Sequence, residues 1–307
     1  MDNVLKIGHR NFHPKYGWYE VIDKIDNLYF SIKFDSTNYR YACTKYQIFN
    51  NKVCDRRHPS YHQVGEEYEH HIYGKYKIIE LCKNKKAIIE FENTKYRCEC
   101  GINNIIKQHV KDPTFPIICN IGYIGESRNV KRMSKTTAYR VWHNMIKRCY
   151  DKELHKKRPT YSKCEVCEEW HCFVNFDKWF SNNYVDNWCL DKDILIKGNK
   201  LYSPSTCCFV PTEINSLFTK RQRQRGETPI GVLFCKASRR FKSCFRAVIN
   251  KNGCKVHIGC YDTAEKAFSA YKEEKEKYIK YMADKWKSLL AANVYDAMYN
   301  YKVEKTD

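Results

Sequence analysis

The chain of 307 residues carries 55 lysine and arginine residues against 35 aspartate and glutamate residues, a formal net charge of +20. No apolar run approaches a membrane span and the N-terminus has no hydrophobic signal core, so we expect a cytoplasmic protein without a membrane partner. The length suits two or three domains with sizeable cores. The charge predicts a polyanionic partner, because phosphates attract cations and release counterions on binding.

The N-terminal third repeats itself, since residues 8–56 match residues 65–113 at a constant offset of 57 without a gap. The recurring residues are Gly8, His13, Tyr16, Gly17, Tyr19, Ile22, Phe34, Thr37, Tyr39, Arg40, Cys43, Ile48, Val53 and Asp55. Short alternating segments such as "LYFSIKF" are rich in β-formers, so we predict two small β-modules, 1–60 and 61–125. A structural or spacing module and a DNA contact remain alternatives for these repeats.

The Pro- and Gly-marked stretch "VKDPTFPIICNIGYIGES" predicts a domain boundary near residue 125 and a central α+β domain over 126–220. Two sets of apolar residues at helical spacing predict helices in that domain. They are Ala138, Trp142, Met145, Ile146 and Cys149, followed by Phe173, Phe176 and Phe180. His143 and His171 stand among aromatic residues, which favours packing roles for both.

The segment "LDKDILIKGNK" at 190–200, with Asn215 further on, resembles the ββα-metal hairpin of HNH endonucleases. That family uses a Leu-Asp-His-Ile strand, an Asn-bearing turn and a helix with another Asn or His. The resemblance implies catalytic roles for Asp191, Lys192, Asp193, Asn199 and Asn215. Lys192 stands where the family has its histidine, and a lysine is a poor base near neutral pH.

Two functional interpretations of this hairpin, and one purely structural interpretation, stay open. Asp191 and Asp193 could ligate Mg²⁺ or another divalent cation while Lys192 orients water or stabilises the transition state. Alternatively, cleavage has been lost and the fold survives as a DNA-binding scaffold. A plainer alternative makes the charged residues strand-edge groups beside an Asn-containing turn.

Seventeen scattered cysteines without an export signal predict mostly reduced, buried thiols. Cys164 and Cys167 have zinc-like spacing, and Cys207 and Cys208 could complete a structural Zn²⁺ site, with Cys172 or Cys189 as alternates.

The linker over 221–230 carries Arg221, Arg223 and Arg225, which we expect to track phosphates, with a solvated linker as the alternative. The last region, 231–307, predicts three strands near 231–235, 243–250 and 254–260, with an Asn252-Gly253 hairpin turn. A helix follows, and we expect Asp262 to cap it and Glu265 to reach back. Its apolar face is expected to run from Ala264 to Trp286 and to take the alkyl stem of Lys275.

The segments "GV" at 231–232, "FRAVI" at 245–249, "NG" at 252–253 and "HIGCYDTAEKA" at 257–267 are similar to the ethylene-response-factor (APETALA-type) DNA-binding domain. Phe245 replaces the tryptophan usual in that family. The resemblance implies that the three-stranded sheet lies in the major groove of double-stranded DNA. It also implies basic DNA-binding residues on the sheet, namely Lys236, Arg239, Arg240, Lys242, Arg246 and Lys255.

The sequence therefore predicts an α+β multidomain protein with two small N-terminal β repeats, a central HNH-like region and a C-terminal three-stranded sheet plus helix. The module order resembles phage or mobile-element HNH-type endonucleases, which implies double-stranded DNA binding with metal-dependent cleavage or nicking. The alternatives are a catalytically inactive DNA-binding regulator or anti-host factor, and an RNA-binding module.

Overall fold

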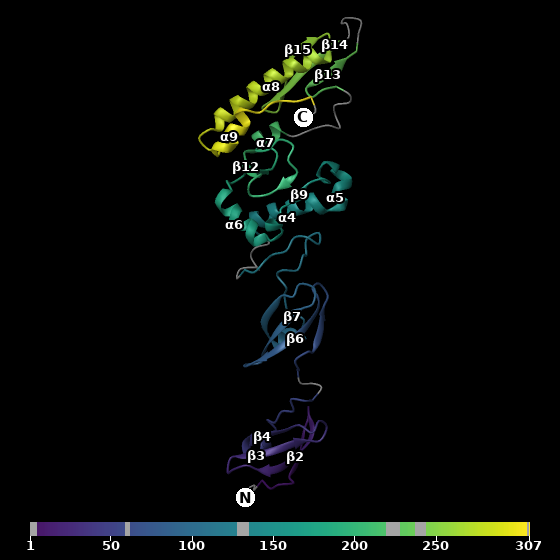
Figure 1. Cartoon of the computed structure of the whole chain (residues 1–307), viewed down its shortest axis with the longest axis vertical. Helices are drawn as coiled ribbons and strands as arrows, with labels where there is room; N and C mark the ends of the chain where they lie inside the picture. Colours follow the sequence, from purple (N-terminus) through teal and green to yellow (C-terminus); the bar gives the residue numbers. More distant parts are fainter. Residues whose placement is uncertain (1–4, 59–61, 128–134, 219–227, 237–243, 306) are drawn as a thin grey trace. The chain divides into compact units, whose positions relative to one another are not determined.

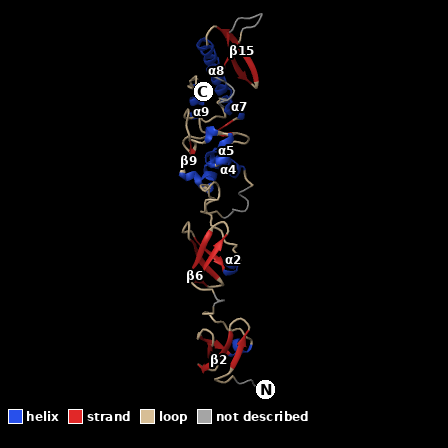
Figure 2. Cartoon of the chain, turned by 90° about the vertical axis from the view of Figure 1, so that its right-hand side faces the viewer, coloured by secondary structure: helices blue, strands red, loops and turns tan. Residues whose placement is uncertain are grey.

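The computed structural model describes residues 5–58, 62–127, 135–218, 228–236, 244–305 and 307 (Figure 1). The chain divides into two compact units, residues 1–112 and 113–307. Figure 2 shows that strands dominate the first unit, whereas the second contains the long helices. The predicted α+β multidomain class is confirmed.

The first unit holds two four-stranded antiparallel sheets, one for each sequence repeat. The first sheet comprises β1 (Arg10–His13), β2 (Gly17–Lys24), β3 (Tyr29–Phe34) and β4 (Arg40–Thr44), followed by α1 (Lys45–Phe49). The second comprises β5 (Glu67–His70), β6 (Gly74–Cys82), β7 (Lys86–Phe91) and β8 (Arg97–Gly101), followed by α2 (Ile102–Ile106). Both sheets have neighbouring strands in sequence order, so the predicted duplication is a duplication of fold.

Many of the recurring residues are buried at equivalent places in the two cores. Tyr19 and Tyr76 are almost fully buried, and their hydroxyls donate to the carbonyl oxygens of Ile48 (3.2 Å) and Ile105 (2.9 Å). A buried polar pair also recurs, because the Thr37 hydroxyl donates to Asp55 and that of Thr94 donates to Asp112. A buried carboxylate is costly unless it is hydrogen-bonded, which explains why both members of the pair are repeated.

The segment before the central helices belongs to the second unit, although the sequence suggested a boundary near residue 125. Tyr123 N donates to His171 O (2.9 Å), and Phe173 N donates back to Tyr123 O (2.8 Å). Ile118 and Ile124 pack against the central core. This pairing joins residues almost fifty positions apart, so local composition could not reveal it.

The central region confirms the two predicted helices, α4 (Thr137–Tyr150) and α6 (Phe173–Asn183), with the predicted apolar residues buried. Its smaller elements complete the region. They are α5 (Lys152–Lys157), the 3-10 turns η1 (Pro159–Tyr161) and η2 (Glu168–His171), β9 (Glu165–Val166), β10 (Cys189–Asp191), β11 (Leu201–Tyr202), β12 (Cys208–Val210) and α7 (Thr212–Leu217). β10 and β12 pair antiparallel and are followed by α7, while β11, on the segment that joins them, pairs with β9.

The C-terminal region consists of β13 (Val232–Cys235), β14 (Cys244–Lys251), β15 (Cys254–Tyr261), α8 (Ala264–Trp286) and α9 (Ala292–Tyr299). This confirms the predicted three-stranded sheet with a following helix. In Figure 1, α8 runs along the sheet, and its buried residues share one core with Val232, Ala247 and Ile249. The same core includes Val210 and Ile214 from the central region.

Two details at α8 differ from the expectation. Thr263, not Asp262, is the N-cap and accepts from Lys266 N, while Asp262 instead forms an ion pair with Lys266 Nζ. The hydroxyl of Thr263 is one position nearer the first turn of α8 than the carboxylate of Asp262, so it reaches the backbone N–H of Lys266, which has no partner within the helix.

Within the described part of the chain, no helix is both long and apolar enough to cross a membrane.

Candidate nucleic-acid interface and nuclease-like hairpin

The C-terminal sheet has one face covered by α8, and no other element among the described residues covers its second face. Successive residues of a strand point to opposite faces, so buried Ala247 and Ile249 on β14 place Arg246 and Asn250 on the open side. Cross-strand register puts Leu233 and Cys260 beside Arg246, and Lys255 beside Asn250. Most side chains of this outer face are exposed. The exposed side chains are those of Leu233, Arg246, Asn250, Lys255, His257 and Cys260.

Three of the sequence-predicted DNA-binding residues lie in the described part of the chain. Arg246 and Lys255 are exposed on the outer face, and exposed Lys236 follows β13 directly. Among the ion pairs formed by described residues, none involves these three cations, whereas several lysines of α8 are paired with glutamates. Six further predicted residues lie outside the described residues. They are Arg221, Arg223, Arg225, Arg239, Arg240 and Lys242.

Sequence reasoning missed two polar residues of the outer face, Asn250 and His257. From the turn outward, Lys255 pairs with Asn250 and His257 with Val248, and the register shifts only beyond these pairs, between Val248 and Ala247. A β-bulge of this kind re-aims side chains and changes which residues share a face. The Asn252-Gly253 turn fixes the register at one end of the hairpin, and counting outward from it would have found both residues.

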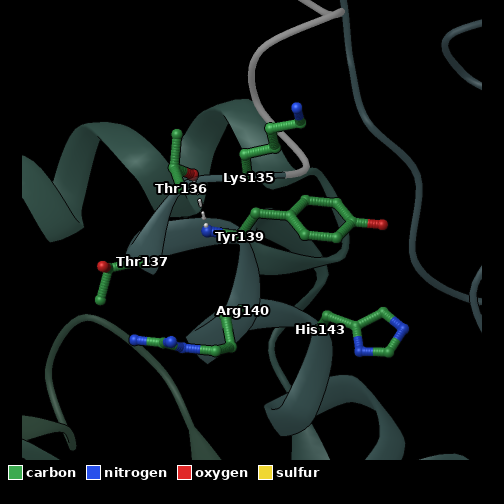
Figure 3. Close-up of a pocket in the computed structure, with 6 residues that line it drawn as sticks. All are labelled: Lys135, Thr136, Thr137, Tyr139, Arg140 and His143. Atoms are coloured by element: carbon green, nitrogen blue, oxygen red, sulfur yellow. Dashed lines mark hydrogen bonds between the residues drawn. The ribbon is translucent and has the colours of Figure 1, made fainter.

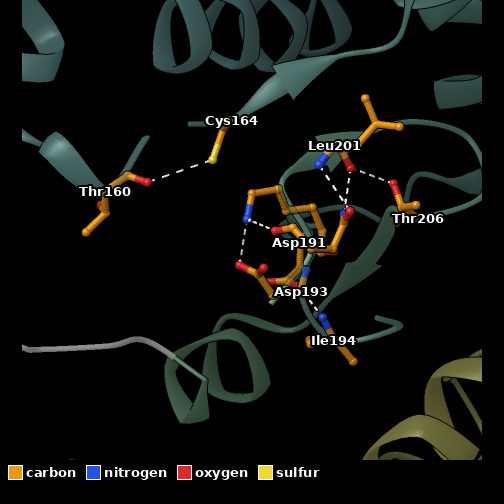
Figure 4. A network of polar contacts seen from close by, with 9 residues as sticks. Thr160, Cys164, Asp191, Asp193, Ile194, Leu201 and Thr206 are labelled. Carbon is orange, nitrogen blue, oxygen red and sulfur yellow. Dashed lines mark hydrogen bonds and ion pairs between the residues drawn. The ribbon is translucent and has the colours of Figure 1, made fainter. Parts of the chain in front are cut away.

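The loop after β10 buries Lys192, which is 5% exposed. Its Nζ donates to Asp193 Oδ2 (2.8 Å), which is labelled in Figure 4, and to Asn199 O (2.9 Å). It also lies 5.7 Å from the centroid of the Tyr202 ring. Burial would lower the pKa of Lys192, but the hydrogen bond and charge of Asp193 outweigh it, so the pKa is raised. Lys192 is therefore a protonated ion-pair partner at neutral pH and cannot accept a proton as a general base.

The side chains of Asp191 and Asn199 shape the same loop. Asp191 Oδ1 accepts from Asp193 N (2.7 Å) and Ile194 N (2.8 Å), as in an Asx-turn. The Asn199 amide donates to Lys192 O (2.9 Å) and Leu201 O (2.6 Å). Burial raises the pKa of Asp191, even though the hydrogen bonds from the backbone N–H groups of Asp193 and Ile194 favour its charged form.

The structure thus brings together four of the five predicted catalytic residues, Asp191, Lys192, Asp193 and Asn199. The fifth, Asn215, is half-buried on α7, which meets β10 where Cys189 Sγ lies 3.4 Å from Thr212 Oγ1. The described residues include no group of three or more His, Cys, Asp or Glu side chains arranged to hold a metal ion. A divalent cation at this loop would have to use Asp191 and Asp193 together with water or phosphate oxygens.

The four cysteines considered for zinc are divided between two cores. Cys207 lies in the central core with Cys164, whereas Cys208 lies in the core shared with the C-terminal region. Cys207 directly precedes β12 and Cys208 begins it, and the two thiols lie in different cores, so they do not converge on one site. Burial raises the pKa of Cys207 to about 12 and raises that of Cys208 further, which disfavours the thiolates that zinc needs. All 17 cysteines are free thiols.

A pocket of about 260 Å³ lies at the start of α4 (Figure 3). It is lined by Lys135, Thr136, Thr137, Tyr139, Arg140 and His143. Burial, with the nearby charge of Lys147, lowers the pKa of His143, and the imidazole stacks on Tyr139 (5.8 Å). The lining offers cations and hydroxyls without a carboxylate, which suits an anion better than a metal ion. No sequence-predicted site residue belongs to it.

Comparisons with known proteins add no relative, because no protein-family model, curated protein or solved structure matches the chain.

Proposed function

We propose that this protein binds double-stranded DNA through the outer face of β13, β14 and β15. The observation that carries the proposal is a sheet face on which Arg246 and Lys255 are exposed, with neither cation in an ion pair among the described residues. A narrow β-sheet can enter the major groove, where arginine suits guanine and lysine holds phosphate. The net charge of +20 supports a phosphate-rich partner.

The similarity of residues 231–267 to the APETALA-type domain agrees with this proposal, since that family also docks a three-stranded sheet in the major groove. In such a complex His257 and Asn250 would lie on the docking face with the two cations. The protein would act in the cytoplasm, where its thiols stay reduced.

The geometry of the 191–201 loop favours a scaffold over a nuclease. Lys192 is buried and ion-paired, and Asp191 and Asn199 are engaged with the backbone of their own loop. Metal-dependent cleavage remains the second candidate, because antiparallel β10 and β12 are followed by α7, as in a ββα hairpin, and two carboxylates stand on the segment that joins the strands.

DNA binding is tested with Arg246→Ala and Lys255→Ala in the full chain, using duplexes selected from a random library. Loss of an arginine–guanine contact costs about 1–3 kcal/mol, so Arg246→Ala should weaken binding by roughly 5-fold to 150-fold. Lys255→Ala should weaken binding to all sequences and reduce the salt slope by about 1. The matched control is Lys277→Ala, an exposed lysine of α8 paired with Glu273. Unchanged affinity in both sheet variants would refute the proposal.

Cleavage is tested by incubating the protein with supercoiled plasmid and Mg²⁺ or Mn²⁺, against an EDTA control. The scaffold interpretation expects salt-sensitive binding without nicks. Metal-dependent nicks that disappear in Asp191→Ala, with affinity kept, would establish the nuclease instead.

A further inference from the structure

The two N-terminal repeats share a fold and differ on one exposed face, which gives an internal comparison within a single chain. In the first repeat, buried Tyr19 and Val21 place Trp18 and Glu20 on the outer face of β2. Trp18 is 52% exposed and pairs across the sheet with Phe12, which is 48% exposed. Solvent-exposed aromatic pairs of this kind are stacking platforms when a cation stands beside them.

The aromatic pair has both the geometry and the charge for such a platform. The rings of Phe12 and Trp18 meet edge to face with centroids 5.4 Å apart, and the Arg10 guanidinium lies 5.7 Å from the Trp18 ring centroid. The next cross-strand row carries Arg10, Glu20, Lys33 and Arg40. Arg10 also pairs with Asp35, while Lys33 and Arg40 take no part in the ion pairs formed among described residues.

The second repeat has no exposed aromatic pair at the equivalent positions. Glu69 and Lys75 replace Phe12 and Trp18, and both are exposed. The adjoining row reads Glu67, Lys77, Glu90 and Arg97, and Arg97 pairs with Glu90. With Asp35 included, the first face has three cations and two acids; with Glu92 included, the second has three cations and four acids.

The same contrast recurs at the short helix that ends each repeat. In the first repeat Lys52 Nζ lies 4.9 Å from the centroid of exposed Tyr46, and Lys45 Nζ lies 5.8 Å from that of exposed Phe49. The offset of 57 puts Asn103, His109, Ile102 and Ile106 at these four positions of the second repeat. The pairs Arg10–Trp18, Lys52–Tyr46 and Lys45–Phe49 therefore have no counterpart at the equivalent positions of the second repeat.

We propose that the outer face of the first repeat, centred on Phe12 and Trp18, binds single-stranded nucleic acid. Unpaired bases expose the flat faces that stack on aromatic rings, and the phosphates between them meet Arg10, Lys33 and Arg40. A duplex hides those faces in its own stack, so this site is distinct in chemistry from the proposed duplex-binding sheet. The inference does not depend on that sheet.

The test uses the full chain and a fluorescein-labelled oligothymidine of about 15 nucleotides, with binding followed by fluorescence anisotropy. The stacking energy of about 1–3 kcal/mol per base predicts that Phe12→Ala combined with Trp18→Ala weakens binding roughly 10-fold to 100-fold. The matched control is Glu69→Ala combined with Lys75→Ala, which changes the same two positions of the second repeat and should bind at least as well as the parent.

Two further variants separate stacking from other causes of weaker binding. Trp18→Phe keeps an aromatic ring and should retain most of the affinity for oligothymidine. In the parent, bound oligothymidine should quench the fluorescence of Trp18, and this part of the quenching should be absent in the variant. Arg246→Ala combined with Lys255→Ala should leave oligothymidine binding intact, so failure of the duplex-binding proposal is distinguishable from failure of this one.

The proposal is overturned if the parent chain does not bind oligothymidine, or if the Phe12 and Trp18 double variant binds it as tightly as the parent. The first result would assign the aromatic face to a protein or peptide partner. An equal loss in the second-repeat control would overturn it as well, because the effect would then not be specific to the aromatic face.

Discussion

Lys275 offers a sharp test of how the C-terminal region is held together. It lies on α8 between the buried residues Tyr271 and Tyr278, and burial lowers its pKa to about 8, an effect opposed in part by the charge of Asp307. The ordinary value is 10.5, so the shift is about 2.5 pKa units, or about 3 kcal/mol at 1.36 kcal/mol per unit. That is the free energy that the folded protein loses by keeping Lys275 charged at neutral pH.

The sign follows from proton linkage. Between about pH 8 and 10.5 the unfolded chain holds the Lys275 proton while the folded chain has released it, so stability rises with pH over this window. Below pH 8 both states are protonated and the full cost is present. Replacing the ammonium with an uncharged group of similar shape should remove the cost.

We therefore expect Lys275→Met to be more stable than the parent by up to about 3 kcal/mol at pH 7, with the gain vanishing near pH 10.5. Urea unfolding followed by tryptophan fluorescence measures this, provided the dependence on urea is unchanged. Lys277→Met, at an exposed position of the same helix, is the control and should show no such pH-dependent gain. A gain of equal size at pH 7 and 10.5 would refute the reasoning, as would no gain at all.

Two further predictions concern backbone and buried polar positions. Gly231 has φ +74° and an added Cβ would overlap the Tyr271 ring, so Gly231→Ala should cost about 3 kcal/mol or more, whereas Gly253→Ala, at φ +80° in open space, should cost about 1 kcal/mol; thermal unfolding that ranks them otherwise would contradict the packing. Thr37→Val removes the hydroxyl donor to buried Asp55 and should cost about 1–3 kcal/mol in urea unfolding, and a neutral result would show that the carboxylate finds another donor.

Local periodicity was sufficient to predict most of the secondary structure. The alternating segments of both repeats and of residues 231–261 became strands, because period-two patterns predict which side chains a sheet buries. The helical spacing of Trp142 and Ile146 similarly predicted α4, with both residues fully buried. These patterns depend on neighbours a few residues apart, which the sequence displays directly.

The candidate sites depend on longer-range relations that the sequence does not display. Lys192 could be aligned with a family histidine. Its burial against Tyr202 and its hydrogen bond to the Asn199 carbonyl oxygen exist only because the loop folds back on itself, which the local sequence pattern does not display. Cys207 and Cys208 are adjacent in sequence, but Cys207 packs in the central core and Cys208 in the core shared with the C-terminal region. The bulge between Ala247 and Val248 likewise decides which residues of β15 lie beside Arg246, because beyond it Cys260 takes the place that the register of the turn would give to Gly259.

The duplication explains why the aromatic face is informative. The recurring residues are those that the fold requires: buried rings such as Tyr19 and Tyr76, and glycines such as Gly17 and Gly74 that adopt φ +79° and +76°. An exposed strand position has no such requirement, so the fold itself does not explain why a tryptophan stands at 18 and a lysine at 75. Keeping Phe12 and Trp18 in water carries a hydrophobic cost that the second repeat avoids with charged residues. A partner that covers those rings would offset that cost, and for this reason the two repeats are expected to differ in what they bind although they share one fold.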